Sequence, residues 1–416
     1  MSLLLRQVLV GDRRRDVLIE GNRIAGLDGG KAERVIDGSR MAAIPGLVNA
    51  HTHAAMTLLR GYAEDLDLQT WLEKKIWPRE ARLTPEDIYW GTKLACLEMI
   101  RTGTTAFNDM YFHMDRAAVA VKEMGLRAVL SEGFIDIGKA EVSLDLMRHT
   151  EEIHRRIADL GESRLTVAWG PHAPYTVSAE SLQRIAEEAA KADALIHIHV
   201  AESKAEVERS LKATGKTPVA YLDSLGVLSD RVVAAHACWL TPEDAQILAR
   251  HRVNVAHNPV SNMKLASGTM DMPLLAFHGV GVALGTDGAA SNNSLDMFET
   301  MKFAALLQKH ATGQATAVDA HHIFRMATSG GARALRLDAG ELAPGKLADL
   351  VLLDLQGPGM VPRHSLTANL VYGGVSAAVS TVICDGRVLM ADGVVQGEAE
   401  LLEKAGKVAA DLAARE

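Results

Sequence analysis

Cysteine is scarce in this 416-residue sequence, and the three cysteines lie far apart. Cys96, Cys238 and Cys384 form no CxxC pair, which disfavours a disulfide framework and a zinc site made of thiolates. Long hydrophobic runs are also missing, because no window approaches the roughly 18 apolar residues of a membrane span. The opening MSLLLRQVLVGDRRRD interrupts its apolar run with Arg6 and lacks a small-residue cleavage site. We therefore expect a cytoplasmic protein that has no membrane partner.

An excess of positive charge is missing as well. The chain has 44 Lys and Arg against 52 Asp and Glu, a formal charge of -8, which opposes binding to nucleic acid. The segment ATGKTP at residues 213–218 lacks the earlier glycine of a phosphate-binding loop, since Ser210 occupies that position. No GxGxxG follows an early strand, so a dinucleotide cofactor has no support.

What is present is the composition of a globular protein, with 48% hydrophobic and 23% charged residues. Both ends of the chain read as short strands joined by turns, with hairpin signals at Gly21-Asn22 and Asp385-Gly386. Because chain termini often lie close together, the two ends are expected to build one small domain around an inserted one. We predict a composite β-sandwich from residues 1–47 plus 341–416, and a second domain over 48–340.

The middle of the chain alternates short apolar runs with helical patterns, which is typical of βα units around a parallel sheet. Eight such units predict a (β/α)8 TIM barrel of the α/β class, whose site lies at the C-terminal ends of the strands. A doubly wound open sheet fits less well, because polar residues follow nearly every run. The runs are AAIPGLVNAHTH, TTAFNDM, RAVLSEG, LTVAWGPHAP, ALIHIHVAE, VVAAHACW, VNVAHNP and GVALGTDG.

Histidines gather at the ends of these runs. His51 and His53 are two residues apart in a strand, so both can point to one side and bind the same metal ion, although an isolated HxH pair also occurs on solvated strands. His199 in the fifth run and Asp287 after the eighth supply two further ligands. His197 shares the face of His199 but lies deeper, so we expect a core histidine that is hydrogen-bonded to a neighbour.

Three imidazoles and one carboxylate with room for water fit Zn²⁺ and also Fe²⁺. The alternative for Asp287, which precedes Gly288, is a turn or helix-capping residue. A second metal would need a bridging anion, such as a carboxylated lysine on the fourth strand, and LTVAWGPHAP contains no lysine. The sequence therefore predicts one divalent metal per chain.

Three residues around this predicted metal are candidates for proton transfer. Glu202 follows His199 by three residues and is expected above the site as an acid or base, although it could also simply begin a helix. His236 and Asp287 together could take a proton from water that the metal has made more acidic. Because Asp287 also contacts the metal, we expect its carboxylate to stay ionised.

Longer motifs run through nearly the whole chain. The first is PGLVNAHTHAAMTLLRGYAEDLDLQTWLEKKIWPRE, and it is followed by GPHAPYTVS, HVAES, AAHACWL, AHNPVSNMKLASG and LGTDGAASNNSLDMFETMK. In these motifs the chain strongly resembles the amidohydrolase superfamily, specifically its methylthioadenosine/S-adenosylhomocysteine deaminase group, which includes 5'-deoxyadenosine deaminases. The resemblance implies a β-sandwich built from both termini, a mononuclear metal site and hydrolytic deamination of a purine.

The resemblance also implies residue roles. His51, His53, His199 and Asp287 match the metal ligands, and Glu202, His236 and Asp287 match the residues that transfer protons. The nucleoside-binding positions of the family fall on Glu80 and His172, whose carboxylate and imidazole can hydrogen-bond a ribose. Glu202 would protonate N1 of the adenine, His236 or Asp287 would take the proton from water, and the products would be ammonia and an inosine-type nucleoside.

The substituent at the 5' position of the nucleoside is less constrained by these motifs. S-adenosylhomocysteine carries a carboxylate that needs a cation. Glu132 is expected to repel that carboxylate, while Lys139 and Arg148 are candidate cations that the sequence does not place. We therefore expect methylthioadenosine and 5'-deoxyadenosine to be preferred over S-adenosylhomocysteine and adenosine.

Two other functions remain open at this point. A guanine deaminase or a triazine chlorohydrolase would share the metal and differ in the pocket, since one barrel hosts many reactions. A non-catalytic binding protein that kept the fold is disfavoured, because buried histidines and carboxylates without a metal are costly. A homo-oligomer is also expected.

Overall fold

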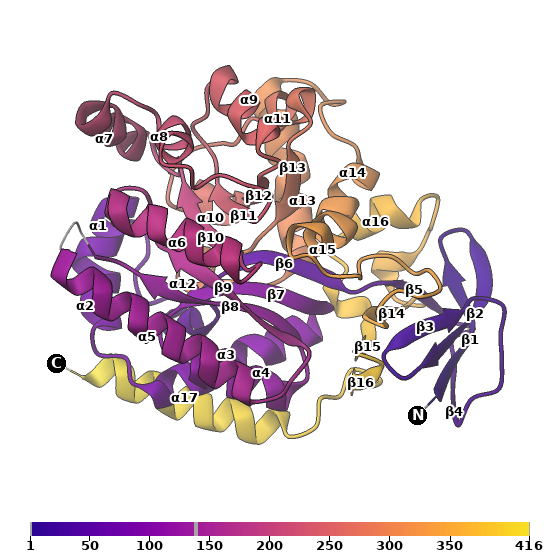
Figure 1. The fold of residues 1–416 in the computed structure, drawn as a ribbon. Helices are drawn as coiled ribbons and strands as arrows, with labels where there is room; N and C mark the ends of the chain where they lie inside the picture. Colours follow the sequence, from indigo (N-terminus) through magenta and orange to yellow (C-terminus); the bar gives the residue numbers. More distant parts are fainter. Residues whose placement is uncertain (1, 137–139, 416) are drawn as a thin grey trace.

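The computed structural model describes residues 2–136 and 140–415, apart from the side chains of residues 140 and 141. Figure 1 shows a central barrel surrounded by helices, with a second sheet beside it that contains strands from both ends of the chain. The predicted TIM barrel with a sheet from both termini is therefore confirmed.

The barrel is an eight-stranded parallel sheet whose strands follow chain order from β6 to β13. Its first and last strands lie together, because the backbone N–H of Asp287 donates to the carbonyl of His51 at 3.0 Å. Each of these strands falls within one of the eight runs predicted from the sequence or ends one residue beyond it. They are β6 (Leu47–Thr52), β7 (Thr104–Tyr111), β8 (Arg127–Phe134), β9 (Leu165–Pro171), β10 (Leu195–Val200), β11 (Val232–His236), β12 (Asn254–His257) and β13 (Gly281–Leu284).

Capping residues set the starts of the helices that surround the barrel. Thr84 and Thr241 each form a capping box with the aspartate three residues later, and the Ser178 side chain accepts from the Ser181 N–H. The helices between barrel strands are η1 (Ala54–Leu59), α1 (Leu68–Trp71), η2 (Leu72–Ile76), α2 (Trp77–Glu80), α3 (Pro85–Arg101), α4 (Met114–Met124), α5 (Ala140–Asp159), α6 (Ala179–Lys191), α7 (Lys204–Thr214), α8 (Pro218–Ser224), α9 (Pro242–Arg250), α10 (Pro259–Lys264) and α11 (Met272–His278).

After the last barrel strand the chain forms further helices and then returns to the second sheet. These helices are α12 (Ala289–Asn292), α13 (Met297–Thr312), α14 (Ala320–Arg325), η3 (Met326–Gly330), α15 (Gly331–Ala334), η4 (Pro358–Met360), α16 (Leu366–Tyr372), η5 (Ser376–Ala378) and α17 (Glu398–Ala414). In Figure 1 the C-terminal α17, in yellow, runs along α3 on the outside of the barrel.

The second sheet has the order β16-β15-β14-β5-β1-β2-β3, and β4 pairs with β1. Both predicted hairpins are present, because Gly21-Asn22 joins β2 to β3 and Asp385-Gly386 joins β15 to β16. The strands are β1 (Ser2–Val10), β2 (Arg13–Glu20), β3 (Arg23–Gly26), β4 (Arg34–Asp37), β5 (Met41–Pro45), β14 (Leu350–Asp354), β15 (Val379–Cys384) and β16 (Arg387–Met390).

A buried ion pair joins the barrel to the second sheet. Arg127 begins β8, and its guanidinium contacts Asp349 at 3.0 Å and Asp385 at 3.1 Å. Burial lowers the pKa of Arg127, but its charge interactions and hydrogen bonds, chiefly with Asp349, together outweigh burial and raise that pKa above its ordinary value. The two parts are also continuous in the chain, since only Gly46 separates β5 from β6. A Cβ at Gly46 would lie 2.0 Å from Thr105 Oγ1, so only glycine fits this close approach.

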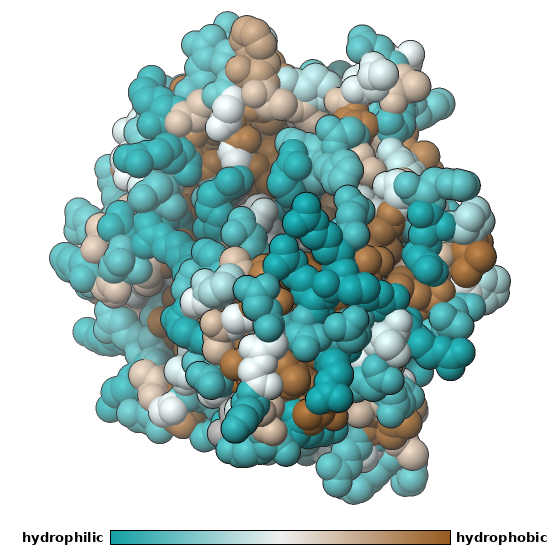
Figure 2. Space-filling model, turned by 90° about the vertical axis from the view of Figure 1, so that its right-hand side faces the viewer, coloured by the Kyte–Doolittle hydropathy of each residue, from teal (hydrophilic) through white to brown (hydrophobic). Residues whose placement is uncertain are grey.

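The outer surface is mainly hydrophilic on the face that Figure 2 shows, where hydrophobic residues form small patches between charged and polar ones. Within the described part of the chain, no helix is long and apolar enough to cross a membrane.

Candidate active site

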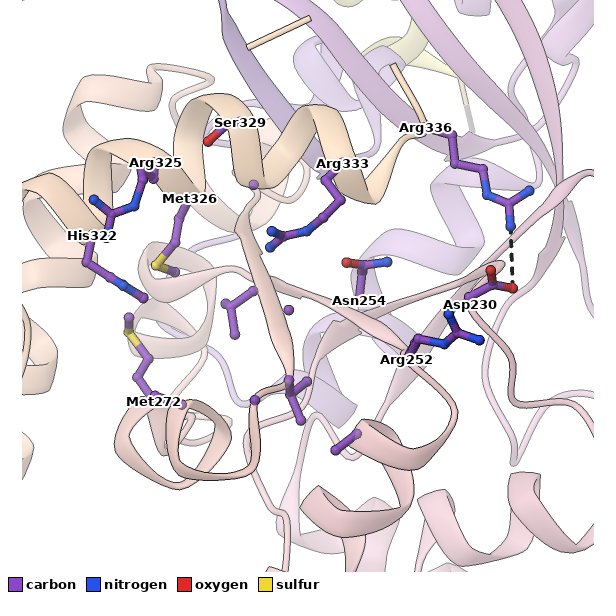
Figure 3. Close-up of a pocket in the computed structure, with 17 residues that line it drawn as sticks. Asp230, Arg252, Asn254, Met272, His322, Arg325, Met326, Ser329, Arg333 and Arg336 are labelled. Carbon is purple, nitrogen blue, oxygen red and sulfur yellow. Dashed lines mark ion pairs between the residues drawn. The ribbon is translucent and has the colours of Figure 1, made fainter. Parts of the chain in front are cut away.

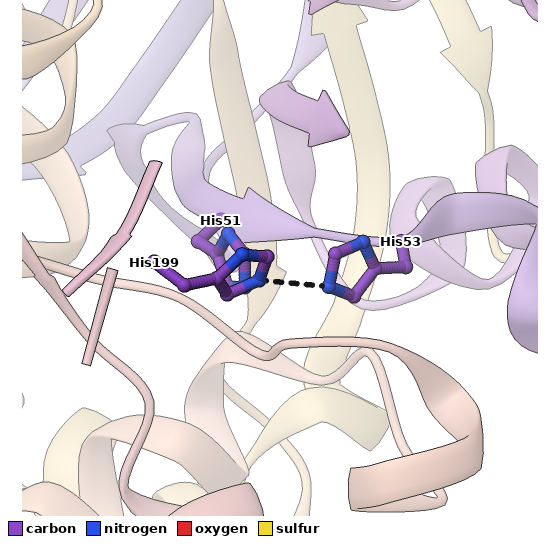
Figure 4. A group of neighbouring side chains, drawn as sticks. All are labelled: His51, His53 and His199. Carbon is purple, nitrogen blue, oxygen red and sulfur yellow. Dashed lines mark hydrogen bonds between the residues drawn. The ribbon is translucent and has the colours of Figure 1, made fainter. Parts of the chain in front are cut away.

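Three histidines converge at the C-terminal end of the barrel, from two strands that are far apart in sequence. His51 and His53 come from the end of β6, and His199 comes from β10 (Figure 4). The Nε2 atoms of His53 and His199 are 3.3 Å apart. The ligand atoms that these three residues offer all lie within 4.8 Å of one another, which is close enough for one metal ion.

The other ring nitrogen of each histidine is held by a neighbour. His51 Nδ1 lies 2.7 Å from Nε2 of His197, His53 Nδ1 lies 2.5 Å from the Met110 carbonyl, and His199 Nδ1 lies 2.6 Å from the His172 carbonyl. A carbonyl can only accept, so Nδ1 of His53 and of His199 carries the proton and Nε2 is left free to bind a metal; Nε2 of His51 is free in the same way when its Nδ1 donates to His197. The structure therefore orients three Nε2 atoms for one ion, and it confirms the hydrogen-bonded core histidine expected at His197.

Asp287 completes this group from the loop after β13. Its Oδ1 lies 3.3 Å from Nε2 of His51 and 3.3 Å from Nε2 of His53. The Ser261 hydroxyl donates to Asp287 Oδ2 at 2.6 Å, and the Gly288 N–H donates to Oδ1 at 2.8 Å. The carboxylate is thereby fixed at the centre of the histidine cluster.

The electrostatics of this cluster favour a bound cation. Burial raises the pKa of Asp287, but its contacts with His51 and His53 outweigh burial and hold that pKa well below its ordinary value. Burial lowers the pKa of His53, but Asp287 outweighs burial and raises it to about 9. Nε2 of His51 is buried without a hydrogen-bond partner. A buried carboxylate beside an unpartnered imidazole nitrogen fits a divalent metal, which would compensate both.

Glu202 and His236 lie beside the cluster. The Glu202 carboxylate is 3.8 Å from His236 Nδ1, and the Asn262 side chain lies 2.8 Å from that same nitrogen. Burial raises the pKa of Glu202 well above its ordinary value, and the charges of Asp287 and Glu206 add to this rise. Burial therefore favours the protonated, neutral form of the Glu202 carboxyl. Burial lowers the pKa of His236 to about 3, so this imidazole is neutral.

Two of the predicted site residues have a strained backbone. His236 has φ of 74° and Asp287 has φ of 62°, in the left-handed region that residues other than glycine rarely adopt. Such strain persists only where surrounding contacts hold it, and it is frequent at functional sites. Ala201, with φ of 50°, is a third residue with such a backbone, and the Glu206 carboxylate holds its loop by accepting from the backbone N–H groups of Ala201 and Glu202 at 2.8 Å each.

Glu80 and His172 line the cavity above the histidine cluster, opposite a largely apolar wall. Burial raises the pKa of Glu80, although the Tyr111 hydroxyl acts against this rise. His172 Nδ1 lies 3.0 Å from Thr176 Oγ1, and burial lowers the pKa of His172 to about 4. The apolar wall includes Leu68, Trp71, Leu72, Trp77, Phe112 and Ile135.

All eight residues predicted for the site are thus brought to one end of the barrel. Four further residues that contact the predicted site residues or their backbone were not predicted from the sequence. They are Asn262, Ser261, Glu206 and Tyr111. Asn262 and Ser261 lie in AHNPVSNMKLASG, but nothing in that motif alone indicates which side chains they contact. Asn262 and Ser261 follow β12, whereas their partners His236 and Asp287 lie at the end of β11 and in the loop after β13. These contacts therefore form only when the barrel brings the three strands together.

Glu132 does not act on the 5' substituent as expected, and the candidate cation Arg148 lies away from the cavity. The Glu132 carboxylate accepts from the N–H groups of His113 and Met114 at 3.1 and 2.8 Å, so it caps α4 instead of facing the cavity. Arg148 pairs with Asp145 on the outside of α5, and 78% of its side chain is exposed. Lys139 lies outside the described residues.

Comparison with known proteins gives the family of the chain. The family model described as "Amidohydrolase family" matches residues 42–389. A 5'-deoxyadenosine deaminase from Methanothermobacter thermautotrophicus is 52% identical over 95% of this chain and 92% of its own. A 5-methylthioadenosine/S-adenosylhomocysteine deaminase from Pelotomaculum thermopropionicum is 50% identical over 91% of this chain and 89% of its own.

Solved structures agree with this assignment. An adenosine deaminase from Xanthomonas campestris with bound zinc superimposes with a TM-score of 0.94 at 35% identity, covering 99% of both chains. A zinc complex of atrazine chlorohydrolase from Arthrobacter aurescens gives 0.91 at 25% identity, covering 98% of this chain and 100% of that chain. With this fold, this cluster of histidines and the family match over most of its length, the chain belongs to the amidohydrolase family.

Proposed function

We propose that this protein is a metal-dependent hydrolase that converts the 6-amino group of adenosine-type nucleosides to the inosine-type product, with release of ammonia. The observation that carries the proposal is Glu202, a buried carboxyl beside the histidine cluster, 3.8 Å from His236, whose pKa burial raises well above its ordinary value. Deamination at C6 needs an acid of this kind to protonate N1 of the ring. The relatives named as deaminases support the same reaction.

The proposed metal ligands are His51, His53, His199 and Asp287, and the proposed ion is a single Zn²⁺, with Fe²⁺ as the alternative. Zinc is favoured by the imidazole and carboxylate ligands and by the zinc present in the two similar structures. A metal ion bound there lowers the pKa of water, so that hydrolysis proceeds at neutral pH.

The chain's own residues provide the remaining steps. Glu202 donates its proton to N1 as water adds to C6, and His236 or Asp287 accepts the proton that this water loses. The amino group takes up that proton as its bond to C6 breaks, and the C6 hydroxyl returns a proton to Glu202. Asn262 holds His236 in place through the 2.8 Å contact at Nδ1. The released amino group leaves as ammonia.

Glu80 and His172 are proposed to bind the sugar. A carboxylate can accept from both hydroxyls of a ribose, and an imidazole can donate or accept at the edge of the ring. Glu80 is the last residue of α2 and lines the cavity, and burial raises the pKa of its carboxyl. Glu80, His172 and Glu202 line the same cavity. A ligand that contacts all three needs a sugar as well as a base, which supports a nucleoside over a free base.

We propose that the preferred 5' substituents are small and uncharged, as in 5'-methylthioadenosine and 5'-deoxyadenosine, with S-adenosylhomocysteine and adenosine as poorer substrates. Among the described residues that line the cavity, none is Lys or Arg, so a terminal carboxylate would lack a cation. This argument replaces the one from Glu132, which does not face the cavity.

The domain organisation proposed with this function is a β-sandwich of 1–47 plus 341–416 and a catalytic barrel of 48–340. The second sheet, with β1–β5 and β14–β16, supports the division, although α17 lies against α3 of the barrel. We also propose that the protein is a cytoplasmic homo-oligomer that does not bind nucleic acid.

The test is a substrate panel assayed with purified zinc-loaded protein. Conversion of adenine to hypoxanthine changes the ultraviolet absorbance, and ammonia is measured in parallel. We expect turnover of 5'-deoxyadenosine, methylthioadenosine, S-adenosylhomocysteine and adenosine, and none of guanine or atrazine. Turnover of guanine or a triazine without turnover of any adenosine derivative would contradict the proposal and favour the related hydrolases, of which the atrazine chlorohydrolase is one structural neighbour.

A further inference from the structure

A second cavity, of about 770 Å³, lies at the opposite end of the barrel. It is bounded by α9 and α11 on one side and by α14, η3 and α15 on the other (Figure 3). Its floor contains Asn254 and Gly281, the first residues of β12 and β13, whereas the candidate active site lies beyond the last residues of these strands. We call it the basal cavity, defined by Arg252, Asn254, Gly281, Arg325, Ser329 and Arg333.

The basal cavity carries an excess of positive charge. One carboxylate, Asp230, lies in its lining together with four arginines. Arg336 is neutralised by ion pairs with Asp230 at 3.4 Å and with Asp193 at 2.9 Å. Within residues 2–136 and 140–415, the other three form no ion pair: Arg252, Arg325 and Arg333. This concentration of positive charge occurs in a chain whose net charge is -8.

One helical face presents most of these groups. Arg325, Ser329 and Arg333 are four residues apart, so they lie on the same side of the continuous helical stretch α14–η3–α15. The middle turn, η3, is a π-helix, and π-bulges occur frequently at functional sites. His322 lies one turn earlier on this face. Burial and, to a smaller extent, the charge of Arg325 lower the pKa of His322, while Asp319 acts against this shift.

The floor of the basal cavity is open because residue 281 is a glycine. A Cβ at Gly281 would lie 2.7 Å from Oδ1 of Asn254 and 3.5 Å from Nη2 of Arg333. Without that Cβ, the Asn254 amide and the Arg333 guanidinium remain accessible from the same space. This side of the cavity therefore offers hydrogen-bond donors from the guanidinium groups of Arg325 and Arg333, the Asn254 amide and the Ser329 hydroxyl.

We propose that the basal cavity binds an organic phosphate of the nucleotide class. Guanidinium groups bind phosphate through paired hydrogen bonds, and three of them here have no carboxylate partner among the described residues. The volume falls within the range of about 300–1,000 Å³ that is usual for small-molecule sites, and a phosphate ion alone would leave most of it empty. Met272, Val280 and Met326 supply an apolar wall for the rest of such a ligand.

The test measures binding of ADP by calorimetry to the full chain at about 0.15 M salt, where weak surface attraction is screened. The Glu80→Gln variant is the background, because it weakens nucleoside binding in the proposed active site. We expect one ADP per chain, with Arg333→Gln and Arg325→Gln each weakening the Kd about tenfold. Arg333→Lys keeps the charge but loses the planar guanidinium, so its Kd for ADP should lie between those of the background protein and of Arg333→Gln. Arg184→Gln, an exposed arginine on α6, is the matched control and should bind as before.

Three outcomes would overturn the proposal. They are no binding of ADP, an equal loss of ADP affinity in the Arg184 and Arg333 variants, and binding of inorganic phosphate as tight as that of ADP. An unchanged melting temperature of each variant shows that the fold is intact. Deaminase activity of Arg333→Gln with the Glu80 side chain present should equal that of the unmodified chain. Failure of the basal site is therefore distinguishable from failure of the proposed function.

Discussion

Individual residues in the site depend on partners that do not touch the proposed metal. His197 is the clearest example, because its Nε2 lies 2.7 Å from Nδ1 of His51 and both side chains are fully buried. Burial and the neighbouring imidazoles lower the pKa of His197 well below its ordinary value, so it is neutral. It therefore fixes the tautomer of His51 without adding charge to the cluster.

Replacing this partner should weaken metal binding. We expect His197→Phe to lower zinc affinity by about 10- to 100-fold, the usual effect of losing a partner of a metal-bound histidine. Zinc content after dialysis against a graded chelator measures this directly. His154→Phe, at a half-buried histidine on α5 away from the cluster, is the control. Unchanged zinc retention in the His197 variant would show that His51 does not need its partner.

Glu202 should separate catalysis from metal binding. We expect Glu202→Gln to keep zinc yet lose about 10² to 10⁴-fold in kcat, because glutamine cannot give a proton to the purine ring. Glu208→Gln, at an exposed glutamate on the neighbouring α7, should retain full activity. Turnover and zinc content measured on the same preparation give the result. Near-normal turnover in the Glu202 variant would remove Glu202 from the proton-transfer role.

At the scale of elements, the segment that contains α1, η2 and α2 forms one wall of the active-site cavity. Leu68, Trp71 and Trp77 contribute apolar side chains to this wall. The cavity holds about 70 Å³, which is room for only about two water molecules. A nucleoside is larger than this enclosed part of the cavity, so we expect the wall to move when substrate binds.

This movement should be visible in amide hydrogen exchange. In the Glu202→Gln protein, which binds substrate without turnover, we expect exchange of residues 68–80 to change on addition of 5'-deoxyadenosine. Helix α16, remote from the cavity, serves as the internal control and should not respond. Identical exchange with and without nucleoside across 68–80 would mean that another wall admits the substrate.

At the scale of the whole molecule, the barrel and the second sheet are joined by Arg127 and its two aspartates. Both Arg127 and Asp349 are nearly fully buried, so removing the guanidinium leaves an unpaired buried carboxylate. Breaking a buried ion pair in this way costs about 3–5 kcal/mol. The pair therefore couples the two parts of the protein in folding.

We expect Arg127→Gln to lower the free energy of unfolding by about 3 kcal/mol and to reduce the melting temperature. Chemical denaturation of the metal-loaded protein measures the change. Arg148→Gln removes an exposed pair with Asp145 and should change stability by less than about 1 kcal/mol. A similar small effect in both variants would contradict a structural role for Arg127.

The barrel could be predicted from the sequence because each strand is marked locally. A short apolar run followed by a polar residue and a helical pattern recurs eight times, and each of the eight strands falls within its run or ends one residue beyond it. The convergence of His51, His53, His199 and Asp287 followed from the rule that parallel strands present their C-terminal ends on one side. The orientation of Glu132 did not follow, because its N–H partners on α4 come from the turn after the preceding strand.

The sequence by itself determined the order of strands and helices, the positions of the hairpin turns and the residue types available to the site, because alternation, capping and turn preferences act over a few neighbouring residues. Only the tertiary structure decided which nitrogen of each histidine is free, how Asn262 and Ser261 hold the site, and that three arginines surround the basal cavity. Those properties depend on distances between segments that are far apart in the chain, and closure of the barrel sets these distances.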